Sequence, residues 1–154
     1  MEKKIVEDFI YNGLGFPVKL EKIEMVKIDR EWHPKIDARK ISDQAIKILV
    51  SRSQRLTGNQ VRFVRAYFSM SLREFAKEVV HESHSAVAKW ESSLDEVTNM
   101  DINIEMILRL YAIEQLESKT AKERNQFYEK YLQLKKICAA DRQSTQLSLG
   151  VLVA

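Results

Sequence analysis

The sequence predicts a mainly α-helical protein that carries a small β-hairpin near its N-terminus. Beyond residue 37, many apolar residues recur three and four positions apart, the spacing of one face of an α-helix. Several of these stretches begin with a Ser, Thr or Asp that can cap a helix, and two of them carry Glu three residues later. Residues 17–36 instead show the shorter period typical of strands. We therefore expect a helical bundle with N-terminal and C-terminal extensions.

The N-terminal extension is expected to span residues 1–50. Residues 2–10 place Ile5, Val6, Phe9 and Ile10 at helix-like spacing. A hairpin is predicted from the segments 17–28 and 31–36, which Asp29-Arg30 separates. Within it, Trp32-His33 is either a binding contact or an aromatic side chain packed on the core beside an exposed imidazole. An isolated two-stranded hairpin is marginal in water, so it should pack on the helices or pair with another chain.

A helix is predicted from Asp37 to Arg55, and it links the hairpin to the central block. Its apolar face consists of Ile41, Ala45, Ile46, Leu49 and Val50. The polar and basic stretch 51–55 at its end is either a solvated connector or an arm that contacts phosphates.

Residues 71–91 have the pattern of two short helices separated by a tight turn. Ser71 and Glu74 form a capping box, and Phe75, Ala76 and Val79 follow on one apolar face. Ser83 begins the second helix, whose apolar face consists of Ala86, Val87 and Trp90.

Residues 56–91 resemble the DNA-binding domain of lambda-repressor-like helix-turn-helix proteins, of the Cro and xenobiotic-response-element type. The residues that carry the resemblance are, in order, Thr57 at the start of a first helix, Met70-Ser71, Phe75-Ala76, Ser83, Ser85-Ala86-Val87 and Trp90-Glu91. Two positions depart from the family's pattern. Leu72 stands where the family has Gln, and segment 79–82 lacks the family's turn glycine and is one residue longer. The resemblance implies a five-helix bundle that binds operator DNA, usually as a dimer that reads two half-sites.

Two further helices are predicted after residue 100. The first is capped by Asp101 and carries an apolar stripe of Ile104, Ile107, Leu108, Tyr111 and Leu116. The second runs from Thr120 to about Cys138, with Phe127, Tyr131, Leu134 and Ile137 or Cys138 on one face. This last helix either packs on its own bundle or pairs with the same helix of a second subunit. The apolar end of segment 141–154 is an added strand, a partner contact or a disordered tail.

Composition sets limits on the function. The 154 residues are 45% hydrophobic, which is enough for a core, and the formal net charge is +3. Residues 52–91 contain seven cations and four carboxylates, so their net charge of +3 equals that of the whole chain. Cys138 is the only cysteine, so the chain cannot form an internal disulfide. The sequence also has no apolar run long enough to cross a bilayer, and its first residues include acidic side chains. These features predict a cytoplasmic protein without a membrane segment. No pattern indicates a nucleophile, a phosphate-binding loop or a metal site, so we expect neither an enzyme nor a cofactor.

The residue pattern and the resemblance together predict a sequence-specific DNA-binding regulator of the repressor type. His84, Ser85 and Lys89 lie on the outer surface of the second short helix, where hydrogen-bonding side chains read base edges in the major groove. Arg65 could hold Glu91 or another acid in a salt bridge, whereas Arg62 and Arg73 at helix starts either reach phosphates or are merely solvated. The full set of expected DNA-binding residues is Arg62, Ser71, Arg73, Ser83, His84, Ser85 and Lys89.

We expect three domains: the extension 1–50, a DNA-binding domain at 51–117, and a C-terminal helix and tail at 118–154, which are the candidate dimerisation segment. The expected partners are double-stranded DNA and a second copy of the chain. One alternative is a helix-turn-helix that has lost DNA binding and serves as a protein module. Another follows from a resemblance to the antitoxins of type II toxin-antitoxin systems, which neutralise a toxin and bind their own promoter. In that case the open strand edge of the predicted hairpin is the expected toxin contact.

Overall fold

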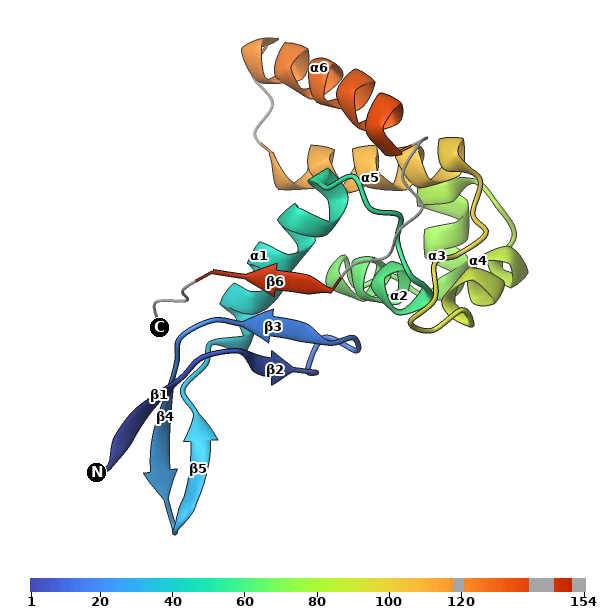
Figure 1. The fold of residues 1–154 in the computed structure, drawn as a ribbon. Coiled ribbons are helices and arrows are strands. Elements are labelled where there is room, and N and C mark those ends of the chain that lie inside the picture. Colours follow the sequence, from blue (N-terminus) through green and yellow to red (C-terminus); the bar gives the residue numbers. More distant parts are fainter. Residues whose placement is uncertain (118–120, 139–145, 151–154) are drawn as a thin grey trace. The chain divides into compact units, whose positions relative to one another are not determined.

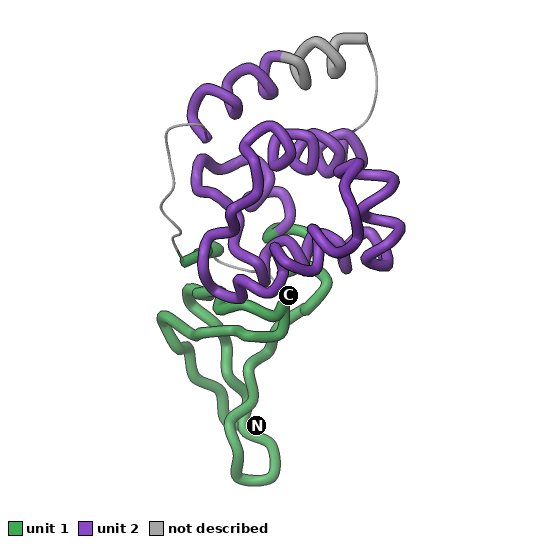
Figure 2. Tube along the Cα trace, turned by 90° about the vertical axis from the view of Figure 1, so that its right-hand side faces the viewer, with its two compact units in different colours: residues 1–45, 146–154 green, residues 46–145 purple. Residues whose placement is uncertain are grey.

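The computed structural model describes residues 1–117, 121–138 and 146–150, with the backbone alone for residues 121–128 (Figure 1). The chain forms two compact units (Figure 2). The first comprises residues 1–45 and 146–154, and the second comprises residues 46–145. Strands lie in the first unit and most of the helices in the second.

Two three-stranded sheets form the first unit. One has the order β1-β4-β5, with β1 at Lys3–Val6, β4 at Ile23–Ile28 and β5 at Glu31–Pro34, all antiparallel. The other has the order β2-β3-β6, with β2 at Phe9–Tyr11, β3 at Val18–Leu20 and β6 at Leu147–Leu149. Strands β2 and β3 are antiparallel, whereas β3 and β6 are parallel.

The two sheets correct the expected fold class. A mainly α-helical protein with one small hairpin is wrong, because the described residues contain six strands in two sheets beside the helices. The first error lies at residues 2–10, where β1 and β2 replace the expected helix. Asp8 has a positive φ of 61° and breaks the segment, and Ile5 is 71% exposed instead of lying on a buried helical face. Pairing of β1 with β4, a contact distant in sequence, outweighs the local spacing.

The predicted hairpin is present in part, as β4 and β5 with Ile28 opposite Glu31. Residues 18–20 of its predicted first strand instead form β3, which pairs with β2 and β6 in the other sheet. The turn consists of Asp29 and Arg30, which both adopt positive φ as a two-residue hairpin turn requires. Trp32 is half-buried, with the Lys4 ammonium 4.3 Å from its ring centroid, and His33 is exposed.

The C-terminal segment supplies a strand, which was one of the three alternatives for it. Leu147 and Leu149 of β6 alternate inward and are buried, and β6 pairs with β3 far away in sequence.

The second unit contains the helices and the end of α1. Their bounds are α1 Ala38–Ser51, α2 Gly58–Tyr67, α3 Leu72–Phe75, a π-helix η1 at Ala76–Val80, α4 His84–Glu91, α5 Ile102–Leu116 and α6 Ala121–Cys138. Thr57 and Gln60 form a capping box at the start of α2, and Asp101 caps α5. The helix predicted over 37–55 ends at Ser51. No helix in the described part of the chain combines the length and the apolar composition that crossing a membrane requires.

The buried face of α5 differs from the predicted stripe. Ile107 is 40% exposed, whereas Glu105 and Arg109 are completely buried. Their charges are compensated inside the unit: Arg55 and Arg109 both pair with Glu105, at 3.0 and 3.2 Å. The Arg109 guanidinium also donates to the backbone carbonyls of Leu49, at 3.0 Å, and Arg52, at 2.6 Å. These contacts connect α5 to the segment between α1 and α2, so that segment is a fixed connector and not a free arm.

In α6 the described residues bury Leu134 and Cys138, while Ile137 is 42% exposed. Cys138 is therefore the residue that completes the predicted face. The Thr120 cap and the Phe127 side chain lie outside the described part of the structure.

Candidate nucleic-acid interface

The helices α3/η1 and α4, joined by a short turn, confirm the prediction of two short helices over residues 71–91. Both begin at the expected caps. The Ser71 Oγ accepts a hydrogen bond from the Glu74 N–H at 3.1 Å, and the Ser83 Oγ accepts one from the Ala86 N–H at 3.1 Å. Each hydroxyl is therefore already an acceptor within its helix.

The extra residue in this segment is accommodated within the first helix of the pair. Residues 76–80 form a π-helix, which takes one more residue per hydrogen-bonded turn than an α-helix. The chain then reverses at His81, which adopts the left-handed conformation with φ 54° and ψ 43°. The Glu82 N–H donates to the Ala76 carbonyl at 3.0 Å and closes the helix end. His81 thus takes the place that a turn glycine has in the resembling family.

The inner face of α4 is anchored by apolar packing and by a buried carboxylate. Val87, Trp90 and Glu91 are buried, which confirms Trp90 as a core residue. Glu91 receives Arg65 Nε at 2.8 Å and Arg65 Nη2 at 2.8 Å, so the expected salt bridge is confirmed as a bidentate pair. These hydrogen bonds raise the pKa of the Arg65 guanidinium above its ordinary value. A second cation, Arg62, contacts Glu91 Oε1 through Nε at 3.1 Å.

Backbone packing also fixes α4 against the start of α2. A Cβ on Gly58 would lie 2.6 Å from the Trp90 carbonyl oxygen and 2.7 Å from that of Glu91. Only glycine allows this approach without a shift of backbone atoms. The end of α4 and the beginning of α2 are therefore held together by direct backbone proximity as well as by ion pairs.

The outer face of α4 is polar and exposed. His84, Ser85 and Lys89 are exposed together with Ala88, and their side chains form no hydrogen bond or ion pair with any described residue. Arg73 on α3 is likewise exposed and unpaired within the described chain. Lys77 on η1 has the same properties, although it was not among the predicted site residues. Its position four residues after Arg73 was the sequence signal for it, because this spacing places two side chains on one helical face.

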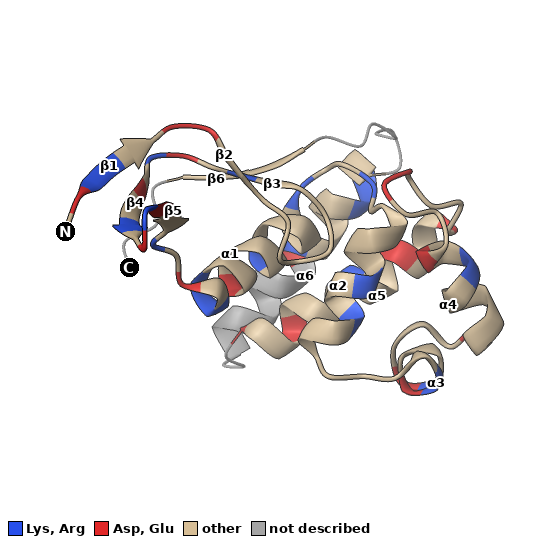
Figure 3. Cartoon of the chain, turned by 90° about the horizontal axis from the view of Figure 1, so that it is seen from below, with Lys and Arg blue, Asp and Glu red and all other residues tan. Residues whose placement is uncertain are grey.

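The seven predicted residues thus differ in their surroundings. His84, Ser85, Lys89 and Arg73 present free side chains, Ser71 and Ser83 cap helices, and Arg62 is about half exposed but pairs with Glu91. The sequence indicated Glu91 as a partner for Arg65 and did not predict that Arg62 pairs with the same carboxylate. In Figure 3 the charged positions of α2 are all basic, whereas α3 and α4 carry both basic and acidic positions.

Comparisons of the chain with protein-family models, with curated proteins and with solved structures found no significant match. The family resemblance stays a prediction that rests on the residues quoted for it.

Proposed function

We propose that this protein is a sequence-specific DNA-binding transcriptional regulator of the repressor type that reads operator DNA with the outer face of α4. One observation supports this proposal most strongly. His84, Ser85 and Lys89 leave their hydrogen-bonding groups unused on the outer face of a helix whose inner face is anchored by Trp90 and Glu91. Rigid helices that carry such side chains can enter the major groove and hydrogen-bond to base edges.

Phosphate contacts would come from the preceding helix. Arg73 and Lys77 are exposed cations without partners among the described residues, and contacts of this kind position a protein on the duplex without reading sequence. Arg62 and Arg65 are assigned a different role, because their pairing with Glu91 holds α4 against α2. We further propose a homodimer, since a single helix of eight residues reads only a short half-site.

Binding to a labelled DNA fragment from upstream of the protein's own gene tests the proposal, with unrelated DNA of equal length as competitor. We expect specific binding that weakens as salt rises, because neutralising phosphates releases counterions. His84→Ala and Lys89→Ala should each weaken specific binding by about 5- to 150-fold, the equivalent of about 1–3 kcal/mol per base contact. Lys35→Ala, at an exposed lysine outside the helices and the candidate dimerisation segment, serves as the matched control and should bind as the parent does.

Arg73→Ala separates the phosphate role from the reading role. It should weaken binding to specific and unrelated DNA alike and reduce the slope of log affinity against log salt by about 1. Equal affinity of the parent for both DNAs, or unchanged affinity of both α4 variants, would refute the proposal.

A second candidate function, an antitoxin that binds a toxin protein and autoregulates its operon, is favoured by the first unit. Within the described residues β1 and β5 each have a neighbouring strand on one side only, and such edges can accept a strand from a partner. Ile5 and Ile28 project exposed apolar side chains from this sheet. The test is titration of the purified protein with the product of any small reading frame adjacent to its gene. Tight binding that Ile5→Asp weakens would support this role, and no binding would exclude that product as the toxin.

A further inference from the structure

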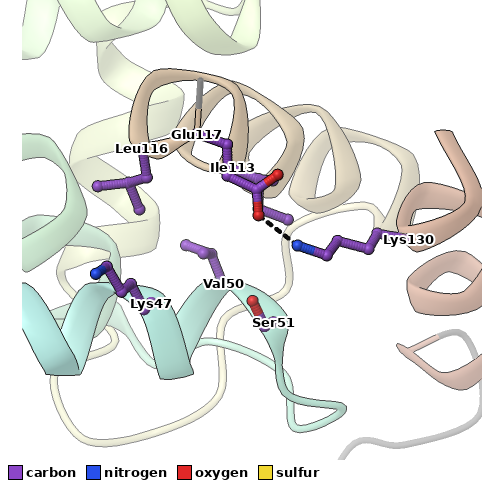
Figure 4. Close-up of a pocket in the computed structure, with 7 residues that line it drawn as sticks. All are labelled: Lys47, Val50, Ser51, Ile113, Leu116, Glu117 and Lys130. Carbon is purple, nitrogen blue, oxygen red and sulfur yellow. Dashed lines mark hydrogen bonds and ion pairs between the residues drawn. The ribbon is translucent and has the colours of Figure 1, made fainter. Parts of the chain in front are cut away.

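The described part of α6 is engaged with its own chain and does not supply a surface for the proposed homodimer. It packs against α5, and Lys130 of α6 forms an ion pair with Glu117 beside an open pocket whose lining both residues share (Figure 4). Leu132 and Ile137 are exposed apolar residues of α6, but they are five positions apart and point to different sides of the helix. The described side chains of α6 thus present no continuous apolar face to a second copy.

Strand β1 has an open edge with an exposed apolar residue at its centre (Figure 1). Within the described residues it pairs with β4 on one side only. The Lys27 N–H donates to the Glu2 carbonyl at 3.1 Å. Because hydrogen-bonded pairs alternate along an antiparallel ladder, the N–H and C=O groups of Lys3 and Ile5 point away from β4. Ile5 is 71% exposed, so this edge can accept another strand.

The two lysines of β1 do not keep another strand away, although charged side chains often protect an edge in this way. The Lys3 Nζ pairs with Glu24 Oε1 at 3.0 Å, and the Lys4 ammonium lies 4.3 Å from the ring centroid of Trp32. Both cations are therefore engaged by neighbours in their own sheet. The backbone groups of the edge remain accessible beside them.

The charges of β1 favour pairing with a second copy of the same strand. In an antiparallel pair with its two-fold axis at Ile5, the two Ile5 residues lie opposite each other and Lys3 lies opposite Glu7 of the second copy. Glu7 is exposed and forms no hydrogen bond or ion pair with any described residue. An axis at Lys4 would instead place two ammonium groups opposite each other, which is destabilising. Asp8, with a φ of 61°, ends the strand.

We propose that two copies of the chain pair through the edges of their β1 strands, with Ile5 at the two-fold axis. The two three-stranded sheets then join into one sheet, and two Lys3–Glu7 ion pairs flank the axis. Because each copy contributes one short strand, we expect a reversible dimer that exchanges with the monomer. This inference names the surface of the homodimer proposed above and rests on that part of the proposed function. The free edge of β5 stays open in this dimer.

Charge reversal tests the two ion pairs, with sedimentation velocity of the full-length protein as the measurement. Lys3→Glu and Glu7→Lys each place like charges opposite each other at both symmetric contacts, so each should weaken dimerisation about tenfold. An equimolar mixture of the two variants restores opposite charges at both contacts of the mixed dimer and should dimerise like the parent. Glu31→Lys makes the same charge change at an exposed position of β5, and this control should leave dimerisation unchanged.

A disulfide tests the position of the axis. Hydrogen-bonded pairs in antiparallel sheets have Cα atoms about 5.5 Å apart, which a disulfide can bridge. Ile5→Cys should therefore form a covalent dimer under mild oxidation. Ile28→Cys is the control on the same face, because the two β4 strands would lie three strand spacings apart, about 14 Å. The buried Cys138 is present in both variants.

Three results would overturn the proposal: a parent protein that stays monomeric at every concentration, a dimer that Glu7→Lys leaves unchanged, or Ile5→Cys cross-linking no faster than Ile28→Cys. None of these readouts involves DNA. Specific operator binding together with any of them would refute this interface and keep the proposed function. A charge-restored dimer without specific DNA binding would do the reverse.

Discussion

The buried cluster of Arg55, Glu105 and Arg109 is the feature whose disruption we expect to affect stability most. Glu105 is completely buried; it forms an ion pair with Arg55 and accepts hydrogen bonds from Arg109 Nε and from the Leu56 N–H, both at 3.2 Å. Glu105→Gln keeps the size of the side chain but removes its charge. Two buried guanidinium groups would then remain without a counter-charge, and the new amide N–H₂ would face them.

Removing one partner from a buried ion pair costs about 3–5 kcal/mol, because the remaining charge stays desolvated. The backbone carbonyls of Leu49 and Arg52 continue to accept from Arg109, but they carry only partial charges. We therefore expect Glu105→Gln to lower the free energy of unfolding by about 3–5 kcal/mol. A domain of this kind has only about 5–15 kcal/mol in total, so the variant should be close to unfolding.

Urea denaturation followed by circular dichroism at helical wavelengths measures this effect. Glu78→Gln is the matched control, because Glu78 is exposed and unpaired within the described chain. Its free energy of unfolding should stay within about 0.5 kcal/mol of the parent value. A Glu105→Gln variant that lost less than about 1 kcal/mol, with an unchanged denaturant slope, would contradict the assigned role of the cluster.

Three further substitutions test how α4 is held and how the turn before it is formed. Gly58→Ala should destabilise the protein by about 1–3 kcal/mol through overpacking against the α4 backbone. Gly150→Ala, whose Cβ would meet nothing within 4 Å, should not do so, and equal melting temperatures of the two variants would count against the close approach. Trp90→Ala should cost about 3–5 kcal/mol in urea denaturation, and a variant as stable as the parent would show that Trp90 is not a core residue. His81→Gly should raise stability by up to about 1 kcal/mol, because glycine adopts positive φ without the strain of a Cβ, and a lower melting temperature would refute this.

The helices around the candidate interface could be predicted from the sequence because their signals are local. The caps at Ser71, Ser83 and Asp101 bind N–H groups two or three residues away, and the apolar positions of α4 recur within one helix. The same periodicity placed His84, Ser85 and Lys89 on the exposed side of α4. The sequence did not predict a π-helix at residues 76–80, although the extra residue that this helix accommodates was visible in the sequence.

The sheets and the buried charges depended on contacts that local patterns do not encode. Residues 2–10 have apolar spacing that suits a helix, and only the available edge of β4 makes β1 a strand. Strand β6 depends on β3, more than a hundred residues earlier in the chain. On α5, Glu105 and Arg109 would be expected on the exposed face because they are charged. They are buried instead, because Arg55 and backbone carbonyls at the end of α1 and after it compensate their charges. The sequence alone therefore determined the helices of the second unit and the exposed polar face of α4. The tertiary structure decided which strand edges pair and which charges are buried, because both depend on partners distant in sequence.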